Sequence, residues 1–531
     1  MFPAAPMRSF GVWSAIARNA AIHRERVAFI DGDVAETHGA FRDRCEALAA
    51  ALLAGGIRPG ERIAVLAENR LAIHALLGAS ARLGAILAPL NWRLRETELA
   101  AIISDCQPSA IIADDATITV ASSLAAGSGA KLRATFGAPG GAFLAYEAVK
   151  AGDAGALPDT ADGDAPLLMI YTAAVDGVAR AATLTGANLV ASAVQLVDAV
   201  GITEADRFLG NLPMFHIMAQ SFAFAVQFAG GATVVRPRFD ATDAAAAIEK
   251  HKVTLLGSFP PMLAGILDAA QSSGADISSL KSVIGLEAPA VIERLERAWP
   301  RSRFWAGFGQ TETSGLVTVG LGSDNPGSAG VAGSLTEIAV VDGADRPVAT
   351  GQVGEIVVRG PAVMAGYWGR EEENAVVFRN GWHHTGDLGK LDAQGRLTYA
   401  GRLPAKELIK TGGENVYPAE VEKALLDSGA VVEAMVFGVP DDKWGERVVA
   451  AVVLRDDAGW GETQLREFIG GRIAAYKRPR DIVFADKLPR GINGLIDRAA
   501  TREAFSGQFS SVKEAPGAAI PTGHSPRLDT Q

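Results

Sequence analysis

The sequence is poor in cysteine and in positive charge, and each shortage excludes a class of protein. Its 531 residues contain only two cysteines, Cys45 and Cys106, so neither a disulfide scaffold nor a multi-cysteine metal centre can form. So few cysteines in so long a chain fit a reducing compartment. The 50 basic and 60 acidic residues give a net charge of −10, which argues against a nucleic-acid partner.

Long uninterrupted apolar runs are also missing. Arg82 interrupts the apolar stretch 73–90, and the stretch 222–235 contains two glycines and is shorter than the roughly 20 residues that a membrane helix needs. The N-terminus lacks the charged-then-apolar order of a signal peptide. The sequence therefore predicts a cytoplasmic protein without a membrane span.

Helix and strand patterns alternate through the first 330 residues. The run Arg62 to Leu66 (RIAVL) is a short apolar strand between the helical patterns 42–53 and 71–84. Such alternation predicts an α/β protein, with layers of helices on a sheet of largely parallel, buried strands. Short strands separated by Gly and Asp turns between residues 331 and 400 predict a β-rich lobe.

A smaller α+β unit is predicted to follow. Residues 1–400 are interpreted as one large N-terminal domain, 401–504 as a mobile C-terminal domain and 505–531 as a disordered tail rich in Gly, Pro and Ser. In the C-terminal domain the patterns predict helices over 419–426 and 462–469, and strands over 431–439, 447–454 and 481–484.

Two motifs in the N-terminal domain combine glycine with groups that bind nucleotides. In Gly307-Phe308-Gly309-Gln310-Thr311-Glu312, the ring can stack on a base, glycine permits a close backbone approach, and Thr-Glu offers oxygens to phosphate and Mg²⁺. In the stretch 381–388, GWHHTGDL, the carboxylate of Asp387 can accept both ribose hydroxyls. The simpler alternatives are a strand followed by a turn, and an aspartate that caps a turn.

These stretches resemble, in order and spacing, the adenylate-forming superfamily of acyl-CoA synthetases, aryl-CoA ligases, adenylation domains and luciferases. The resemblance runs from about residue 10 to residue 504. It includes Leu212 to His216, the segment 285–289, and Gly401-Arg402 with the glycine-rich loop behind it. It implies that the C-terminal domain swings about a hinge at Lys406-Glu407 between acid activation and thiol attack.

The resemblance also implies roles for individual residues. His216 would line the acyl site, although a lone histidine is as readily a satisfied core residue. The catalytic set would be His216, Thr311, Glu312 and Arg180, with Thr172 and Glu312 as metal ligands. The nucleotide and coenzyme A set would be Thr172, Gly177, Glu287, Ala288, Pro289, Phe308, Gly309, Asp387, Arg402, Lys410, Gly412, Gly413 and Trp444.

Two stretches depart from the family pattern. The phosphate loop carries Ala173 and Val175 where hydroxyl side chains are usual, and Asp176 adds a negative charge that repels phosphate unless Mg²⁺ bridges the two. Leu495 replaces a lysine that in the family bridges the carboxylate and the α-phosphate. Three arginines could supply the missing cation, namely Arg180, Arg490 and Arg498, and Arg180 is favoured because it lies on the phosphate loop.

The predicted function is an AMP-forming acid–CoA ligase that uses ATP, Mg²⁺ and coenzyme A. The apolar run 222–228 favours an aliphatic or aromatic carboxylic acid as the substrate. Two alternatives stay open: an enzyme that retains only the thioester half-reaction, and a non-catalytic protein that binds AMP or acyl-CoA. The oligomeric state is also open, with a homodimer among the alternatives.

Overall fold

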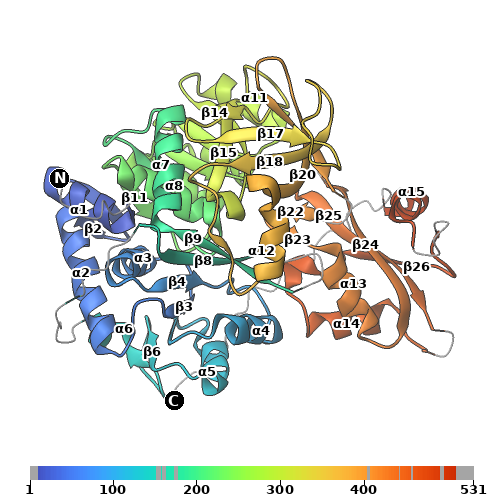
Figure 1. The fold of residues 1–531 in the computed structure, drawn as a ribbon, viewed down its shortest axis with the longest axis horizontal. Coiled ribbons are helices and arrows are strands. Elements are labelled where there is room, and N and C mark those ends of the chain that lie inside the picture. The colour runs from blue at the N-terminus through green and yellow to red at the C-terminus, as the bar shows by residue number, and fades with distance from the viewer. Residues whose placement is uncertain are drawn as a thin grey trace.

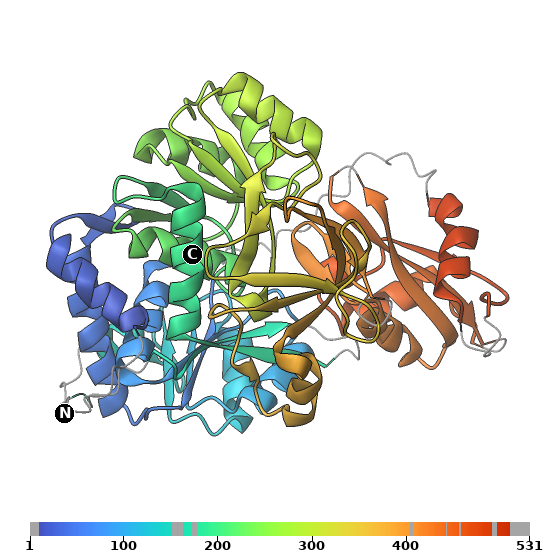
Figure 2. The ribbon, with the colours of Figure 1, turned by 45° about the horizontal axis from the view of Figure 1, so that its top comes forward.

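The computed structural model describes residues 10–150, 157, 163–172, 178–403, 407–441, 443–455, 458–490 and 496–509. Two large sheets with covering helices form the N-terminal body, a small antiparallel sheet forms a lobe on it, and an α+β unit lies at one side (Figure 1). Figure 2 shows the same separation after rotation, with the α+β unit in orange and red beside the body.

The first sheet is parallel at its centre because the strands are short and apolar on both faces. Among the described residues its order is β19-β9-β8-β4-β3-β5-β6-β7, and β9 runs antiparallel to both of its neighbours. The strands are β3 (Arg62–Leu66), β4 (Ile86–Pro89), β5 (Ala110–Ala113), β6 (Leu132–Thr135), β7 (Leu144–Ala145), β8 (Pro166–Thr172), β9 (Arg180–Thr185) and β19 (Gly366–Tyr367). The associated helices are α2 (His38–Ala54), α3 (Leu71–Leu83), α4 (Glu96–Cys106), α5 (Ile118–Gly127), α6 (Tyr146–Lys150) and α12 (Glu371–Val377).

The second sheet has the same construction, with antiparallel strands only toward its edges. In the described part of the chain its order is β16-β15-β14-β13-β12-β10-β11-β1-β2. The strands are β1 (Val27–Asp31), β2 (Val34–Thr37), β10 (Arg207–Gly210), β11 (Ala232–Val235), β12 (Leu255–Ser258), β13 (Ser282–Gly285), β14 (Arg303–Gln310), β15 (Gly315–Leu321) and β16 (Val331–Ala332). The helices are α1 (Val12–Ile22), α7 (Gly186–Val200), α8 (Ile217–Phe228), α9 (Ala241–His251), α10 (Met262–Ser273) and α11 (Pro289–Ala298), and the 3₁₀ turn η1 (Thr311–Thr313) follows β14.

The lobe and the C-terminal unit have their own sheets. The lobe has the order β17-β18-β20-β21, with strands at Glu337–Val341, Gly354–Arg359, His383–Leu391 and Leu397–Arg402, and the 3₁₀ turn η2 spans Arg379–Gly381. The C-terminal sheet contains β22 (Ile409–Thr411), β23 (Glu414–Val416), β24 (Val431–Asp441), β25 (Gly445–Leu454) and β26 (Asp481–Phe484). Its helices are α13 (Pro418–Leu426), α14 (Glu462–Gly470), η4 (Ala475–Lys477) and α15 (Arg498–Phe509).

The layered α/β class predicted from the sequence is confirmed, with a large N-terminal part and a small C-terminal one. One boundary differs. The sequence places a disordered tail from residue 505, whereas α15 continues to Phe509. Phe509 is buried and its ring lies 5.7 Å from that of Phe437, so a tertiary contact extends the helix.

Candidate functional site

The residues expected at the ribose form one buried ion pair. Asp387 of β20 and Arg402 of β21 are register partners, and Arg402 Nε lies 2.6 Å from Asp387 Oδ1. Gln310, at the end of β14, donates from Nε2 to the other carboxylate oxygen at 2.5 Å. Burial alone would lower the pKa of Arg402, but the Asp387 carboxylate outweighs it and the pKa is raised. The carboxylate is therefore oriented by a permanent cation.

A second carboxylate fixes the turn that carries Asp387. Glu355 of β18 accepts the backbone N–H of Gly386 at 2.9 Å through one oxygen and contacts His384 Nδ1, also at 2.9 Å, through the other. Arg379 pairs with Glu355 and with Asp345, which gives this cluster of side chains its own cation. The cluster therefore stabilises the turn through the backbone of Gly386 and the side chain of His384.

Thr311 and Glu312 form the first positions of η1. Glu312 Oε1 accepts the hydroxyl of Tyr367 at 2.7 Å, and the backbone oxygen of Glu312 accepts the N–H of Met364. A Cβ on Gly309 would lie 1.9 Å from the carbonyl oxygen of Gly315, so only glycine fits this approach of β14 to β15. The motif therefore combines an oriented carboxylate with a backbone that has no room for a side chain.

The phosphate end of the site is described only at its borders. Residues 173–177, with Gly177 among them, lie outside the described residues. Thr172 ends β8 and its hydroxyl lies 3.4 Å from the carbonyl oxygen of Arg180. The guanidinium of Arg180 donates to both carboxylate oxygens of Glu373, one of them at 2.5 Å. Arg180 is thus already paired with a carboxylate of α12.

The two predicted adenine contacts lie in different surroundings. Phe308 is 7% exposed and packs in the lobe core with Ile356 and Leu397. Its ring also lies 6.4 Å from that of Tyr399, whose hydroxyl contacts Asp387. Glu287 Oε1 accepts the hydroxyl of Ser258 at 2.7 Å, and burial raises the pKa of this carboxyl. Ala288 and Pro289 cap and begin α11.

The glycine-rich loop of the C-terminal unit lies against the site. Gly412 (φ 58°) and Gly413 (φ 80°) form the turn between β22 and β23, in the left-handed region that favours glycine. A Cβ on Gly412 would lie 2.7 Å from Cε3 of Trp444. The Lys410 ammonium lies 5.2 Å from the ring centre of Tyr399, which itself contacts Asp387. This loop therefore joins the ribose residues to Trp444.

The same loop reaches the predicted acyl site. Glu414 is buried and contacts His216 Nε2 at 3.2 Å, and its other oxygen pairs with Arg93. Burial alone would raise the pKa of Glu414, but His216 and Arg93 lower it to about 2. Sequence reasoning missed Arg93. The available signal was its position just beyond β4, because the carboxyl ends of parallel strands are where sites form.

The hinge and the segment around Leu495 are described only in part. Lys406 and residues 491–495 lie outside the described residues, so the predicted hinge lysine and Leu495 itself are not placed. Glu407 pairs with Arg498 at 2.5 Å, and Arg490 pairs with Glu433. Ile496 packs in the core cluster that includes Phe437 and Phe509. The described flanks of residue 495 therefore lie on the α15 side of the C-terminal unit, at its outer edge in Figure 1.

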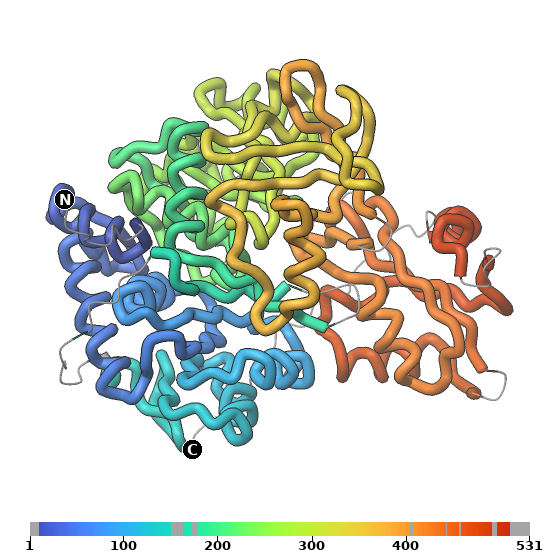
Figure 3. The backbone as a smooth tube through the Cα atoms, viewed as in Figure 1, coloured from blue at the N-terminus to red at the C-terminus, as the bar shows by residue number. Residues whose placement is uncertain are grey.

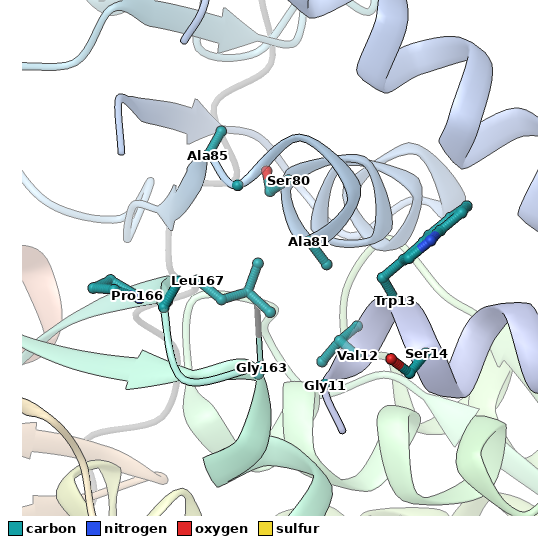
Figure 4. A pocket seen from close by; sticks show the side chains of 13 residues that line it. Gly11, Val12, Trp13, Ser14, Ser80, Ala81, Ala85, Gly163, Pro166 and Leu167 are labelled. Carbon is teal, nitrogen blue, oxygen red and sulfur yellow. The ribbon is translucent and has the colours of Figure 1, made fainter. Parts of the chain in front are cut away.

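A small cavity elsewhere does not compete with this site. Between α1 and α3 lies a space of about 20 Å³ lined by residues such as Val12, Ser80 and Leu167 (Figure 4). It has room for about one water molecule. Among the described residues the buried Ser80 hydroxyl has no hydrogen-bond partner, which such a water would supply.

The fold and the site define an adenylate-binding enzyme with a separate C-terminal domain. The family described as AMP-binding enzyme matches residues 16–368, and the AMP-binding enzyme C-terminal domain matches residues 420–495. The chain therefore belongs to the AMP-binding enzyme family, within the adenylate-forming acyl-CoA ligase superfamily. No helix among the described residues is both long and apolar enough to cross a membrane.

Individual relatives extend over most of the chain. It is 35% identical over 469 residues to the indoleacetate–CoA ligase of Aromatoleum aromaticum, covering 86% of this chain and 91% of that protein. A double mutant of the o-succinylbenzoate CoA synthetase of Bacillus subtilis, bound with its product analogue, is 29% identical to this chain. The match covers 93% of this chain and 98% of that one, with a TM-score of 0.82. The Bacillus subtilis synthetase in complex with ATP and magnesium ion is also 29% identical to this chain. That match covers 93% of this chain and 99% of the other, with a TM-score of 0.67.

Proposed function

We propose that this protein is an AMP-forming acid–CoA ligase with an apolar carboxylic acid as its substrate. The observation that carries the proposal is the loop Lys410–Glu414, which contacts the Asp387–Arg402 side of the site and also His216. A nucleotide, an acyl group and a thiol would therefore meet at one place. Thioester formation from an acyl-adenylate requires that arrangement.

The reaction has two steps. In the first, a carboxylate oxygen attacks the α-phosphorus of ATP, the bond to the bridging oxygen breaks, and pyrophosphate leaves. In the second, the sulfur of coenzyme A attacks the acyl carbon, the bond to the adenylate oxygen breaks, AMP leaves, and the thiol proton passes to solvent. The first step needs positive charge at the phosphates, and the second needs access for the thiol.

Each residue has a proposed place in this scheme. Asp387 would accept the ribose hydroxyls while Arg402 orients its carboxylate. Thr172 with Glu312 would hold Mg²⁺, which supplies positive charge to the phosphates. Glu312 fits that role because Tyr367 occupies one of its oxygens and orients the other. Trp444, with the guanidinium of Arg480 4.8 Å from its ring centre, offers a stacking face and a cation to coenzyme A.

The arrangement of the C-terminal unit corresponds to the second step. The chain superposes better on the relative bound with a product analogue than on that relative with ATP and magnesium ion, although the sequence identity is the same. The difference fits the swing predicted at Lys406-Glu407. It also explains why the described flanks of Leu495 lie away from the nucleotide residues.

Apolar side chains accompany the polar His216 on the proposed acyl side. The rings of Trp92 and Phe215 are edge-to-face with centres 6.5 Å apart. A Cβ on Gly315 would lie 3.0 Å from the Ser221 hydroxyl and 3.7 Å from the sulfur of Met218 in α8. Such walls favour aromatic or aliphatic acids over polar ones. The relative active on indoleacetate is consistent with an aromatic acid.

Pyrophosphate exchange tests the proposal. Indoleacetate, ferulate, o-succinylbenzoate and a long-chain fatty acid are each supplied with ATP and Mg²⁺, followed by coenzyme A with detection of the thioester. At least one acid should drive both exchange and thioester formation. If none drives either, while AMP still binds, the ligase proposal is wrong and the non-catalytic alternative replaces it.

A second candidate is an enzyme specialised for the thioester half-reaction. Leu495 and the altered phosphate loop favour it, because both changes weaken the first step alone. Such an enzyme would convert a chemically prepared acyl-adenylate to thioester with coenzyme A while showing no pyrophosphate exchange.

A further inference from the structure

The C-terminal unit contacts the N-terminal body at residues 91–98, between β4 and the first turn of α4. The Asn91 side chain donates to the hydroxyl of Tyr476 at 3.3 Å, and the Thr97 hydroxyl donates to the backbone oxygen of Arg472, also at 3.3 Å. Two ion pairs cross the same boundary. In Figure 3 the orange and red tube of the C-terminal unit lies beside the N-terminal body.

The first ion pair is centred on a buried lysine. Lys477 of η4 is about 5% exposed and donates to Glu98 of α4 at 2.6 Å, and also to Glu420 of its own unit. Burial alone would lower the pKa of Lys477, but the two carboxylates raise it. Glu420 belongs to the same domain as Lys477, so Glu98 is the partner that a change of domain arrangement removes.

The second ion pair has the opposite polarity. Here the body supplies the cation, Arg93, and the C-terminal unit supplies the carboxylate, Glu414. Along the body the cation Arg93 precedes the carboxylate Glu98. The C-terminal unit places the carboxylate of Glu414 against the first and the ammonium of Lys477 against the second. A displaced or reversed docking would bring like charges together, which is costly at a partly buried interface.

We propose that Arg93 and Glu98 form a two-point charge key that selects the thioester-forming arrangement of the C-terminal domain, with Glu98 as a positioning residue for that step. The inference rests on the proposed function for its catalytic readout only. Within the described part of the chain, no hydrogen bond or ion pair joins Glu98 to His216 or to a proposed nucleotide residue, so Glu98 acts through Lys477. Removing its charge leaves Lys477 with a single carboxylate and weakens one domain arrangement relative to the other.

Glu98→Gln isolates this charge. Glu98 Oε2 also accepts the N–H of Arg95 at the start of α4, and glutamine keeps that cap. The matched control is Glu96→Gln, two residues earlier, because Glu96 contacts Ser123 within the body. Both variants should fold with unchanged thermal stability of the N-terminal body.

The catalytic test compares the two half-reactions for an acid that the parent accepts. Glu98→Gln should slow single-turnover thioester formation from preformed acyl-adenylate by about tenfold and leave pyrophosphate exchange equal or faster. Glu96→Gln should change neither rate. Equal loss of both half-reactions in Glu98→Gln would mean a general structural defect and would overturn the key, as would an unchanged thioester rate.

A cross-linking test needs no substrate. Thr97→Cys with Arg472→Cys places two thiols across the boundary, and a short bismaleimide reports how often the domains are docked. Cys45 and Cys106 are buried, and burial raises the pKa of Cys106 to about 12, so neither competes. Adding Glu98→Gln should slow cross-linking about threefold or more, and adding Glu96→Gln should not.

The two tests separate the inference from the proposed function. If no acid supports either half-reaction but Glu98→Gln slows cross-linking, the key stands and the ligase proposal fails. If both half-reactions proceed in the parent and Glu98→Gln alters neither their ratio nor the cross-linking rate, the ligase proposal stands and the key is wrong.

Discussion

The two ends of the candidate site are built very differently. At the end proposed to hold the ribose and the thiol, Arg402 and Gln310 contact the buried Asp387 carboxylate, and Glu414 links the C-terminal loop to His216. At the phosphate end, the loop lacks two customary hydroxyls, Leu495 replaces a lysine, and Arg180 is paired with Glu373.

The difference separates the two half-reactions. The intact end provides what an acyl-adenylate and a thiol need, whereas the altered end would serve ATP and the departing pyrophosphate. Arg498 and Arg490, the other candidate cations, are also paired with carboxylates in this arrangement. The comparison therefore predicts a protein better equipped for thioester formation than for acid activation.

Restoring the missing lysine should have the largest effect. Leu495→Lys supplies positive charge where negative charge builds up in the first step, and one such contact is typically worth about 10²–10³ in rate. We expect a gain of tenfold or more, and about 10² if no other cation has taken over, in pyrophosphate exchange with a responsive acid. Leu495→Met, of similar size and neutral, is the control. No gain over that control would mean that the phosphate end is not the weak end.

The contribution of Glu414 to the stability of the folded protein should be lost in acid. The pKa of Glu414 falls from 4.5 to about 2 in the folded protein, so its stabilisation is complete above about pH 4.5 and is lost as the pH falls toward 2. Between these limits the loss is about 3 kcal/mol of the free energy of unfolding. Urea unfolding from pH 6 downward should show a shallower decline for Glu414→Gln than for the parent. Asp427→Asn, in an exposed pair with Lys423, should follow the parent. Parallel declines in all three would refute the buried ion pair.

Removing the carboxylate of Asp387 should have a slightly smaller effect, on the free energy of nucleotide binding. Asp387→Ala would delete the two charge-assisted hydrogen bonds proposed between this residue and the nucleotide, about 2–3 kcal/mol of binding free energy. Calorimetric titration with AMP should show this loss. Asp392→Ala, which removes a surface carboxylate paired with Arg396, is the control. An AMP affinity unchanged by Asp387→Ala would place the nucleotide elsewhere.

Replacing Arg180 should have the smallest effect, on the rate of pyrophosphate exchange. Because its guanidinium is paired with Glu373, Arg180→Ala is expected to change pyrophosphate exchange by less than about threefold, as for other ion pairs near the surface. A near-complete loss of exchange would show instead that Arg180 has replaced the missing lysine, and the contrast between the two ends would then disappear.

Local patterns predicted much of the fold and of the ribose site. The strand Arg62–Leu66 follows from a short apolar run. The family resemblance pointed to Asp387 and Arg402 separately, and the structure pairs them across adjacent strands. The contact between Arg93 and Glu414 could not be predicted, because it joins residues 321 positions apart through domain docking. The burial of Phe308 depends in the same way on strands of the lobe that follow it in the chain.

The most direct test of the contrast is a calorimetric titration of the parent protein with AMP and with ATP in the presence of Mg²⁺. The proposed ribose contacts would be common to both nucleotides, whereas the sequence changes fall in segments that the family resemblance assigns to the phosphates. The account predicts that AMP binds at least as tightly as ATP. An affinity for ATP about tenfold or more above that for AMP, a difference of about 1.4 kcal/mol, would contradict it.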